Sequence, residues 1–495
     1  MALKLKLNRR SKVDLSEQLY QSLKQLILEG ELSAGERIPS SRELSQQLKV
    51  SRPTVAVCLE QLQQEGYIEL KHGSGTYVSS QVKENNGSLN RPRQNAAKPH
   101  ALSSYGKFLK QQSKDSDLQT SPVEPEIAFH FWRPALDQFP QTEWARILGR
   151  HARLSESDLS DAPLDASGEA ALRQAIAELV RRFRGVQCNY QQVIIVSGLS
   201  QAIDLVARLH LDEGALAVVE EPGYYQARLA FTALGAKLHA APVDDEGLNL
   251  DGFLKGKTTP KLVYITPSHQ FPTGRTMSLK RRLELLAWAN KQQTIILEDD
   301  YDSEYQKIGK PIPALMSLDK NQSVIYAGTL NQLMFPALGL AYLVVPPNLV
   351  APYRQARALA GAPLPPHLQN AIAQFINEGH LDRHIKRLRN LYDQRRQVLL
   401  DELQAKLSDR VSVSGAESGV FVLARFETKM STSEFVDRAR EAGVALIDTT
   451  AFYAGKAQKN EYILGFGNLN ARQIKEGVKR LATILKNEKT GRQKK

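Results

Sequence analysis

From residue 127 onward, short apolar runs alternate with stretches of helical spacing, and this alternation limits the fold more than any other feature of the sequence. The apolar runs predict strands at 193–196, 215–219, 261–266, 294–298, 323–327 and 340–345. Between them, apolar residues recur every three or four positions, as from Leu172 to Phe183. Strands separated by helices favour an α/β fold with a mostly parallel sheet that is covered on both faces. We expect this domain over residues 127–486, with a small C-terminal α+β lobe from about residue 365.

Residues 1–80 predict a separate and smaller module. Leucines from Leu15 to Leu26 recur at helical spacing, and a second short helix is expected after Pro39. Ser51 is expected to cap a third helix, with Pro53 in its first turn, where a missing N–H costs nothing. Residues 67–78 alternate in polarity around a glycine-rich tip, as a β-hairpin does. Three helices and a hairpin make a winged helix-turn-helix.

Two polar segments complete the predicted organisation. Residues 81–126 lack periodicity, are rich in Ser, Asn, Gln, Lys and Pro, and are expected to form a flexible basic linker. A solvated spacer is favoured over a second nucleic-acid contact for this segment. Residues 487–495 are expected to form a frayed basic tail.

The composition limits the classes of partner and the cellular compartment that can be expected for this chain. The formal net charge of +12 over 495 residues is compatible with a polyanionic partner such as nucleic acid. The sequence has only two cysteines, Cys58 and Cys188, which excludes a disulfide framework and offers no metal-ligand spacing. It has no apolar run long enough to cross a membrane and no secretory signal, so a cytoplasmic protein without a membrane partner is expected.

The small module places short polar and cationic side chains where a recognition helix and a wing meet DNA. The residues expected to contact DNA are Arg42, Ser51, Arg52, Thr54, Lys71, His72, Gly73, Ser74 and Gly75. The alternative interpretation is a winged helix that is used for protein contacts.

The stretch from Leu32 to Leu44, continued by Gly73 to Val78, resembles the GntR-type winged helix, with nearly every landmark at the usual spacing. This resemblance implies binding to double-stranded operator DNA.

Three further motifs resemble those of fold-type I aminotransferases. They are Glu221–Tyr224, Thr266–Gly274 and Glu298–Glu304, in the expected order. Together with the GntR-like module, the chain resembles the MocR group of bacterial transcription regulators. This resemblance implies pyridoxal phosphate (PLP) as the family cofactor and a homodimer with chains packed head to tail. It also implies a possible small-molecule effector.

Several residues are candidates for a PLP-like pocket. Asp299 and Tyr301 are two apart at a strand end, so they are expected to face one side. A carboxylate there can keep a pyridine nitrogen protonated, while the tyrosine bonds the ring's phenolic oxygen. Tyr224 is placed to stack on a ring. Ser200 and the backbone N–H groups beside it are placed to hold a phosphate. The full candidate set is Ser200, Gln201, Tyr224, His269, Asp299, Tyr301 and Gln332.

The same pocket departs from the family pattern at the groups that bind covalently or carry charge. Gln332 stands where the family has its lysine, and an amide cannot form an imine with an aldehyde. Gly339 replaces an arginine that holds the phosphate, and Ile463 replaces one that holds the substrate carboxylate. The segment Pro163–Gly168 lacks a tyrosine that the family uses near the cofactor.

These departures predict a DNA-binding regulator whose aminotransferase-like domain has no catalytic residues and no covalent PLP. Weak non-covalent PLP binding, another ligand, or a role in dimerisation alone all remain compatible with the sequence. The alternative function is a working PLP-dependent aminotransferase with an appended DNA-binding domain. A third is a protein scaffold that binds neither DNA nor ligand.

Overall fold

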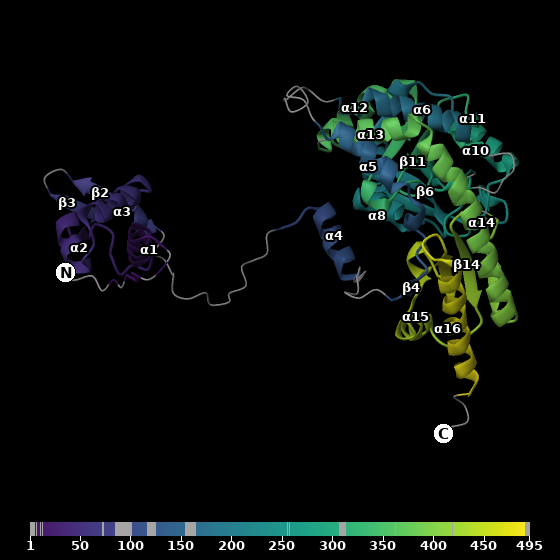
Figure 1. Cartoon of the computed structure of the whole chain (residues 1–495). Coiled ribbons are helices and arrows are strands. Elements are labelled where there is room, and N and C mark those ends of the chain that lie inside the picture. The colour runs from purple at the N-terminus through teal and green to yellow at the C-terminus, as the bar shows by residue number, and fades with distance from the viewer. Residues whose placement is uncertain are drawn as a thin grey trace. The chain divides into compact units, whose positions relative to one another are not determined.

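The computed structural model describes residues 5, 7–9, 11, 13–71, 74–84, 101–115, 125–153, 165–254, 256, 258–305, 313–361, 363–417 and 419–490. The chain forms two compact units, residues 1–101 and 102–495 (Figure 1). No helix among the described residues is long and apolar enough to cross a membrane.

The first unit is a winged helix-turn-helix, as predicted. Its elements are α1 (Leu15–Leu28), β1 (Arg37–Ile38), α2 (Ser41–Leu48), α3 (Arg52–Gln64), β2 (Ile68–Lys71), β3 (Gly75–Val78) and the 3₁₀ helix η1 (Ser80–Glu84). Leu19, Leu23, Val55 and Leu62 are fully buried between α1 and α3, so the predicted apolar stripes do form the core. The short strand β1 was not predicted; it pairs antiparallel with β3 and completes a three-stranded sheet.

The second unit is built on an eight-stranded sheet of order β5-β12-β11-β10-β9-β6-β7-β8. Its strands are β5 (Val193–Val196), β6 (Leu216–Glu221), β7 (Lys237–Asp244), β8 (Gly247–Leu248), β9 (Leu262–Ile265), β10 (Ile295–Asp300), β11 (Val324–Thr329) and β12 (Ala341–Val344). Neighbours from β7 to β11 run parallel, whereas β12 is antiparallel to both of its neighbours and β8 is antiparallel to β7. The mostly parallel sheet is therefore confirmed.

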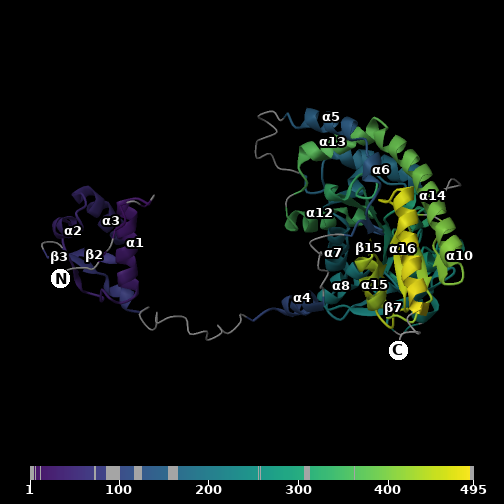
Figure 2. The same cartoon turned by 60° about the horizontal axis from the view of Figure 1, so that its bottom comes forward.

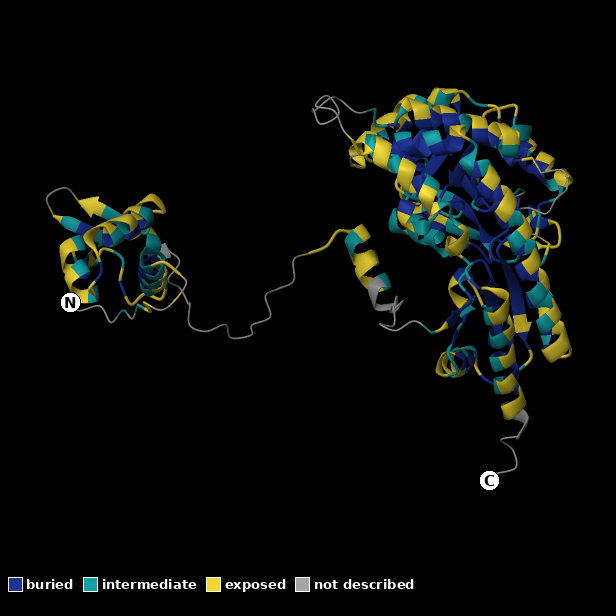
Figure 3. Ribbon diagram, viewed as in Figure 1, coloured by how far each residue is buried: buried dark blue, intermediate teal, exposed yellow. Residues whose placement is uncertain are grey.

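Helices cover both faces of this sheet, and Figure 3 shows the strands as a buried central layer. The covering helices are α5 (Gln141–His151), α6 (Ala170–Arg184), α7 (Leu199–His210), α8 (Tyr225–Ala233), α9 (Asp251–Leu254), α10 (Leu279–Gln292), α11 (Leu315–Leu318), α12 (Val350–Leu359) and α13 (Pro366–Asn377). On β10, Leu297 packs in the cluster of α7, α8 and α12, while its neighbour Ile296 packs with α10 and α11. Because both faces of the sheet are buried, side chains on both faces are apolar, and the sequence of each strand is a continuous apolar run.

The C-terminal lobe follows the long helix α14 (His380–Leu407). It contains β13 (Val411–Ser414), β14 (Phe421–Phe426), α15 (Thr432–Glu441), β15 (Val444–Ala445), β16 (Ile447–Asp448), β17 (Glu461–Gly465) and α16 (Ala471–Thr490). Strand β4 (Ile127–Ala128) pairs with β15, so the start of the predicted domain is part of this lobe. Helix α16 continues to Thr490, which corrects the predicted tail from residue 487.

The predicted linker also needs correction, because part of it is helical. Helix α4 (Ser104–Asp115) belongs to the second unit and contacts α8 (Figure 2). Tyr105 interacts with Arg208 of α7, and Phe108 is half-buried. The sequence did not reveal this helix because few apolar residues mark its inner face among the lysines and glutamines.

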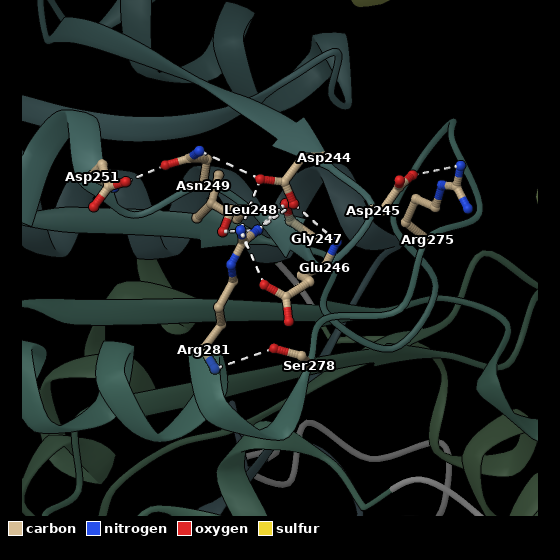
Figure 4. A network of polar contacts seen from close by, with 10 residues as sticks. All are labelled: Asp244, Asp245, Glu246, Gly247, Leu248, Asn249, Asp251, Arg275, Ser278 and Arg281. Atoms are coloured by element: carbon tan, nitrogen blue, oxygen red, sulfur yellow. Dashed lines mark hydrogen bonds and ion pairs between the residues drawn. The ribbon is translucent and has the colours of Figure 1, made fainter.

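An ion-pair network fastens the β7–β8 turn to α10, as Figure 4 shows. Arg281 of α10 makes two parallel contacts with the Asp244 carboxylate, at 2.5 and 2.7 Å, and a third with Glu246 at 3.5 Å. Arg275 pairs with Asp245 at 2.7 Å. A bidentate arginine–carboxylate pair is the strongest form of such a contact, so this turn is held in register with the sheet.

Candidate functional site

Two helix caps shape the part of the winged helix that is predicted to contact DNA, the first turns of α2 and α3. The Ser40 side chain accepts from the backbone of Glu43, whose carboxylate accepts from Ser40 N at 2.7 Å, forming a capping box at α2. Lys49 then takes a left-handed conformation, φ +54°, and turns the chain. Ser51 caps α3 by accepting from Thr54 N at 3.2 Å. The caps therefore set where each helix presents its first turn.

Arg42 and Arg52 lie exposed in the first turns of α2 and α3. Within the described parts of the chain, neither arginine is within ion-pair distance of a carboxylate. The hydroxyls of Ser51 and Thr54 lie 2.6 Å apart, so these two predicted contact residues also bond each other. The two arginines are thus charged groups at this end that can reach phosphates or base edges.

The described residues on the two sides of the wing tip contact each other. Ser74 N donates to Lys71 O at 2.9 Å, and the hydroxyls of Ser74 and Tyr77 are 2.8 Å apart. The Lys71 ammonium lies 5.1 Å from the centre of the Tyr77 ring. The predicted contacts His72 and Gly73 lie outside the described residues.

Gly75 has a conformational requirement that the sequence alone did not show. Its φ of +121° is unfavourable for other residues, and an added Cβ would lie 3.0 Å from Nε of Arg37. Arg37, in β1, is exposed and thereby adds a cation beside the wing. It was missed because a two-residue strand leaves no periodic signal.

The second candidate site lies at the carboxyl ends of three neighbouring parallel strands. His269 follows β9, Asp299 and Tyr301 are at the end of β10, and Gln332 follows β11. Ligands of open α/β sheets bind at this edge. The edge therefore gathers four of the predicted pocket residues from distant parts of the sequence.

Asp299 is buried and only half satisfied. Its Oδ2 accepts from the Tyr264 hydroxyl at 2.5 Å, whereas Oδ1 is buried and has no hydrogen-bond partner among the described residues. The pKa of Asp299 is raised to about 7, and burial is the largest cause. The hydrogen bond from Tyr264 lowers this pKa, whereas neighbouring carboxylates raise it. Oδ1 of Asp299 is therefore suited to accept a hydrogen bond from a protonated nitrogen of a ligand.

Tyr301 and His269 belong to a second buried network. The Tyr301 hydroxyl donates to the carbonyl of His269 at 2.9 Å, and Nδ1 of His269 lies 2.8 Å from Asp302. Burial, with Asp302 and Asp299 nearby, holds the pKa of Tyr301 well above its ordinary value, so the phenol stays protonated. The hydroxyl that was expected to bond a ligand oxygen is thus already bonded within the protein.

Ser200 and Tyr224 meet through Gln226, which was not predicted. The Gln226 side-chain oxygen accepts from both hydroxyls at 2.7 Å. Gln201 turns back and accepts from Ser197 N at 2.8 Å, before the start of α7. Helix α7 has no side-chain cap, so its first N–H groups are suited to an anion.

Aromatic rings surround this edge, and Phe271 is their centre. Its ring lies 6.0 Å from those of Tyr224 and Tyr301, nearly perpendicular to both. Phe131 and Phe452 each lie 4.9 Å from it. These rings make an apolar wall that suits a flat aromatic ligand. The apolar Phe271 within the motif Gln270–Phe271–Pro272 is the signal that would have revealed it.

Three of the four departures from the family pattern have definite places; the fourth, the segment Pro163–Gly168, begins at residues 163 and 164, which lie outside the described residues. Gln332 is held by its backbone carbonyl, which accepts from the Tyr305 hydroxyl at 2.6 Å, while its side-chain oxygen is buried and unpaired within the described structure. Gly339 has φ +62°, with open space where a Cβ would lie. Ile463 is fully buried in β17, between β14 and β16. An apolar core residue therefore occupies the third position.

A clamp joins the C-terminal lobe to the large domain beside this site. The Glu221 carboxylate accepts from Ala454 N and Gly455 N, each at 2.8 Å. Arg228 donates to Phe452 O at 2.7 Å. The first residue of the predicted Glu221–Tyr224 motif thus has a structural role that the sequence did not indicate.

Comparison with known proteins gives consistent matches for both units. Residues 15–78 match the family "Bacterial regulatory proteins, gntR family", and residues 147–481 match "Aminotransferase class I and II". The chain is 36% identical to the probable rhizopine catabolism regulatory protein MocR of Rhizobium meliloti, over 97% of this chain and 96% of that protein. It is 28% identical to the pyridoxine biosynthesis transcriptional regulator PdxR of Corynebacterium glutamicum, over 94% and 95% of the two chains.

Among solved structures, the α-aminoadipate aminotransferase LysN of Thermus thermophilus is similar, with a TM-score of 0.67 and 28% identity. The match covers 79% of this chain and 96% of LysN.

Proposed function

We propose that this chain, a member of the MocR-type transcription regulators, regulates transcription by binding operator DNA as a homodimer. Like those regulators, it joins a GntR-type helix-turn-helix to an aminotransferase class I and II domain. The first turns of α2 and α3 enter or border the major groove, and the β2–β3 wing contacts the adjacent backbone. Exposed Arg42 and Arg52 supply the charge, and a head-to-tail dimer presents two reading heads to paired half-sites.

The aminotransferase-like domain, in this proposal, senses a small molecule and does not catalyse transamination. Gln332 is the single observation that carries this half of the proposal. PLP supplies an aldehyde and an electron-withdrawing ring, and enzymes hold it covalently through a lysine amine. Asp299 and the uncapped start of α7 fit the ring nitrogen and the phosphate of PLP. Gln332, Gly339 and Ile463 do not fit the covalent bond, the phosphate charge or a substrate carboxylate.

Fluorescence anisotropy with a duplex from the upstream region, at fixed salt, tests the DNA-binding half. We expect Arg52→Ala to weaken binding about tenfold or more, since one good base or phosphate contact contributes roughly 1–3 kcal/mol. Arg438→Ala, which removes an exposed arginine of α15, is the matched control and should leave the affinity unchanged. Equal affinities for Arg52→Ala and the native protein would refute the proposed interface.

The alternative function, a working aminotransferase, is favoured by the retained Asp299. Its test is incubation with PLP, reduction with borohydride, and mass spectrometry of the digested protein. Stoichiometric label on one lysine, together with amino-group transfer to a keto acid, would replace our proposal with this alternative. We expect neither.

A further inference from the structure

The outward face of α3 carries apolar side chains in its second turn. Val57 is 55% exposed, and Ala56 beside it is exposed as well. The buried face of this helix is formed by Val55, Cys58 and Leu62. At about 100° per residue, Ala56 and Val57 lie on either side of the direction that points away from this core. Packing within the module therefore does not account for these two residues.

Cationic side chains lie beside this apolar pair. Arg52 precedes Ala56 by one turn of α3 and is exposed. On the side of the wing, Ala56 lines a groove together with Arg37 and Gly75. Because the arginines attract a polyanion, the apolar pair is continuous with the proposed DNA interface.

The second turn of α3 has no exposed polar side chain that can hydrogen-bond a base edge. In the first turn, the hydroxyls of Ser51 and Thr54 lie 2.6 Å apart and bond each other. Glu60 is exposed one turn beyond Ala56, and its carboxylate is repelled by phosphates. The stripe of Ala56 and Glu60 is therefore directed at base edges and not at the phosphate backbone.

Base edges in the major groove present one apolar group, the 5-methyl group of thymine. The other groups there are hydrogen-bond donors and acceptors, and burying them against alanine or valine without a partner costs free energy. Contact with the thymine methyl group removes apolar surface from water on both sides and sacrifices no hydrogen bond. Thymine is thus the base that matches the second turn of α3.

We propose that the second turn of α3 recognises thymine through its 5-methyl group, and that Val57 and Ala56 are the residues that determine this specificity. This inference rests on the proposed DNA-binding function and deepens it, because it names a base that each operator half-site contains at the α3 contact.

Uracil interference with the full chain and a duplex from the upstream region tests this inference. Partial replacement of thymidine by deoxyuridine removes single 5-methyl groups and leaves every hydrogen-bonding group of the base in place. We expect uracil at one or more thymines of each half-site to weaken binding about three- to fourfold, the effect of one lost methyl contact. Duplexes with a single uracil at each of these thymines are then titrated by fluorescence anisotropy at fixed salt.

Variants at the two positions separate a methyl contact from a general loss of binding. Val57→Ala should bind the thymine duplex about three- to tenfold more weakly and should no longer distinguish it from the uracil duplex at the thymines that Val57 contacts. Val57→Thr keeps one methyl group and should retain the distinction. Ala56→Ser tests the second residue in the same way. Leu283→Ala removes a similarly exposed apolar side chain of α10, in the second unit, and should change neither the affinity nor the distinction.

Three outcomes would overturn the inference while the native chain still binds the duplex, and these leave the proposed regulator in place. The first is a native chain that is insensitive to uracil at every thymine. The second is a loss of affinity in Val57→Ala that is equal for the thymine and uracil duplexes. The third is an unchanged interference pattern in both Val57→Ala and Ala56→Ser, with weaker self-association, which would assign the face to a second copy of this chain. A native chain that binds no upstream duplex would refute the proposed function itself, and this inference with it.

Discussion

The buried carboxylate of Asp299, which has a hydrogen-bond partner at one oxygen only, predicts that the protein loses stability as the pH rises. Burial raises its pKa from 3.8 to about 7, so the folded state holds a proton that the unfolded state has released. A raised folded pKa gives stability that is complete below about pH 4 and is lost as the pH rises through 7. The difference between the folded and unfolded pKa values corresponds to a total loss of about 4 kcal/mol in the free energy of unfolding, since each pKa unit contributes about 1.4 kcal/mol.

Asp299→Asn removes this titration and keeps an oxygen for the Tyr264 hydroxyl. Between pH 5 and pH 8, the free energy of unfolding of the variant should rise relative to the native chain by about 2–3 kcal/mol. Glu220 and Glu298, whose pKa values burial also raises to about 7, titrate in both proteins and cancel in the difference. The variant should therefore be more stable than the native chain at pH 8.

Urea unfolding followed by tryptophan fluorescence measures this difference. All three tryptophans, Trp132, Trp144 and Trp288, lie in the second unit, so the signal reports that unit alone. Protein concentration is kept fixed, because dimerisation would shift the apparent stability. A constant difference between Asp299→Asn and the native protein from pH 5 to pH 8 would refute the argument.

Two further predictions concern stability. Arg184→Met breaks a fully buried ion pair with Asp300 and should cost about 3–5 kcal/mol in urea unfolding, whereas exposed Arg181→Met, on the same helix, should cost less than about 0.5 kcal/mol. A loss at Arg184 no larger than at Arg181 would contradict the importance of the pair. Ser51→Ala removes the α3 cap and should cost about 1 kcal/mol, seen as faster hydrogen exchange in the first turn of α3 by mass spectrometry; unchanged exchange there would show that the cap does not hold this turn.

Much of the fold was predictable because its core strands are continuous apolar runs. Strands β5, β6, β9, β10, β11 and β12 lie within a residue or two of the predicted positions. Strand β7 was missed because it lies near the sheet edge, and its residues from Lys237 to Asp244 are mostly half-exposed and of mixed polarity. Strand β1 is too short for any period, and α4 has too few apolar residues.

The site was predictable in its residue types but not in its contacts. Spacing placed Asp299 and Tyr301 at one strand end, and the family motifs pointed to Gln332. The bond between Asp299 and Tyr264 joins residues 35 apart on neighbouring strands, which no local pattern encodes. Phe271 and Gln226 were missed for the same reason, since their roles arise from packing between segments. The functional roles of the pocket residues stay predictions.

Helix α4 determines where this chain can be divided. A fragment that begins at residue 127, the boundary that sequence periodicity suggests, would lack α4. The surface of α8 that α4 contacts would then be exposed, and Arg208 would lose its contact with Tyr105. Such a fragment would expose a surface that the intact chain protects and would tend to self-associate for reasons unrelated to regulation. An expression boundary before Leu102 keeps the helix with the unit it stabilises, and limited proteolysis should respect the same limit.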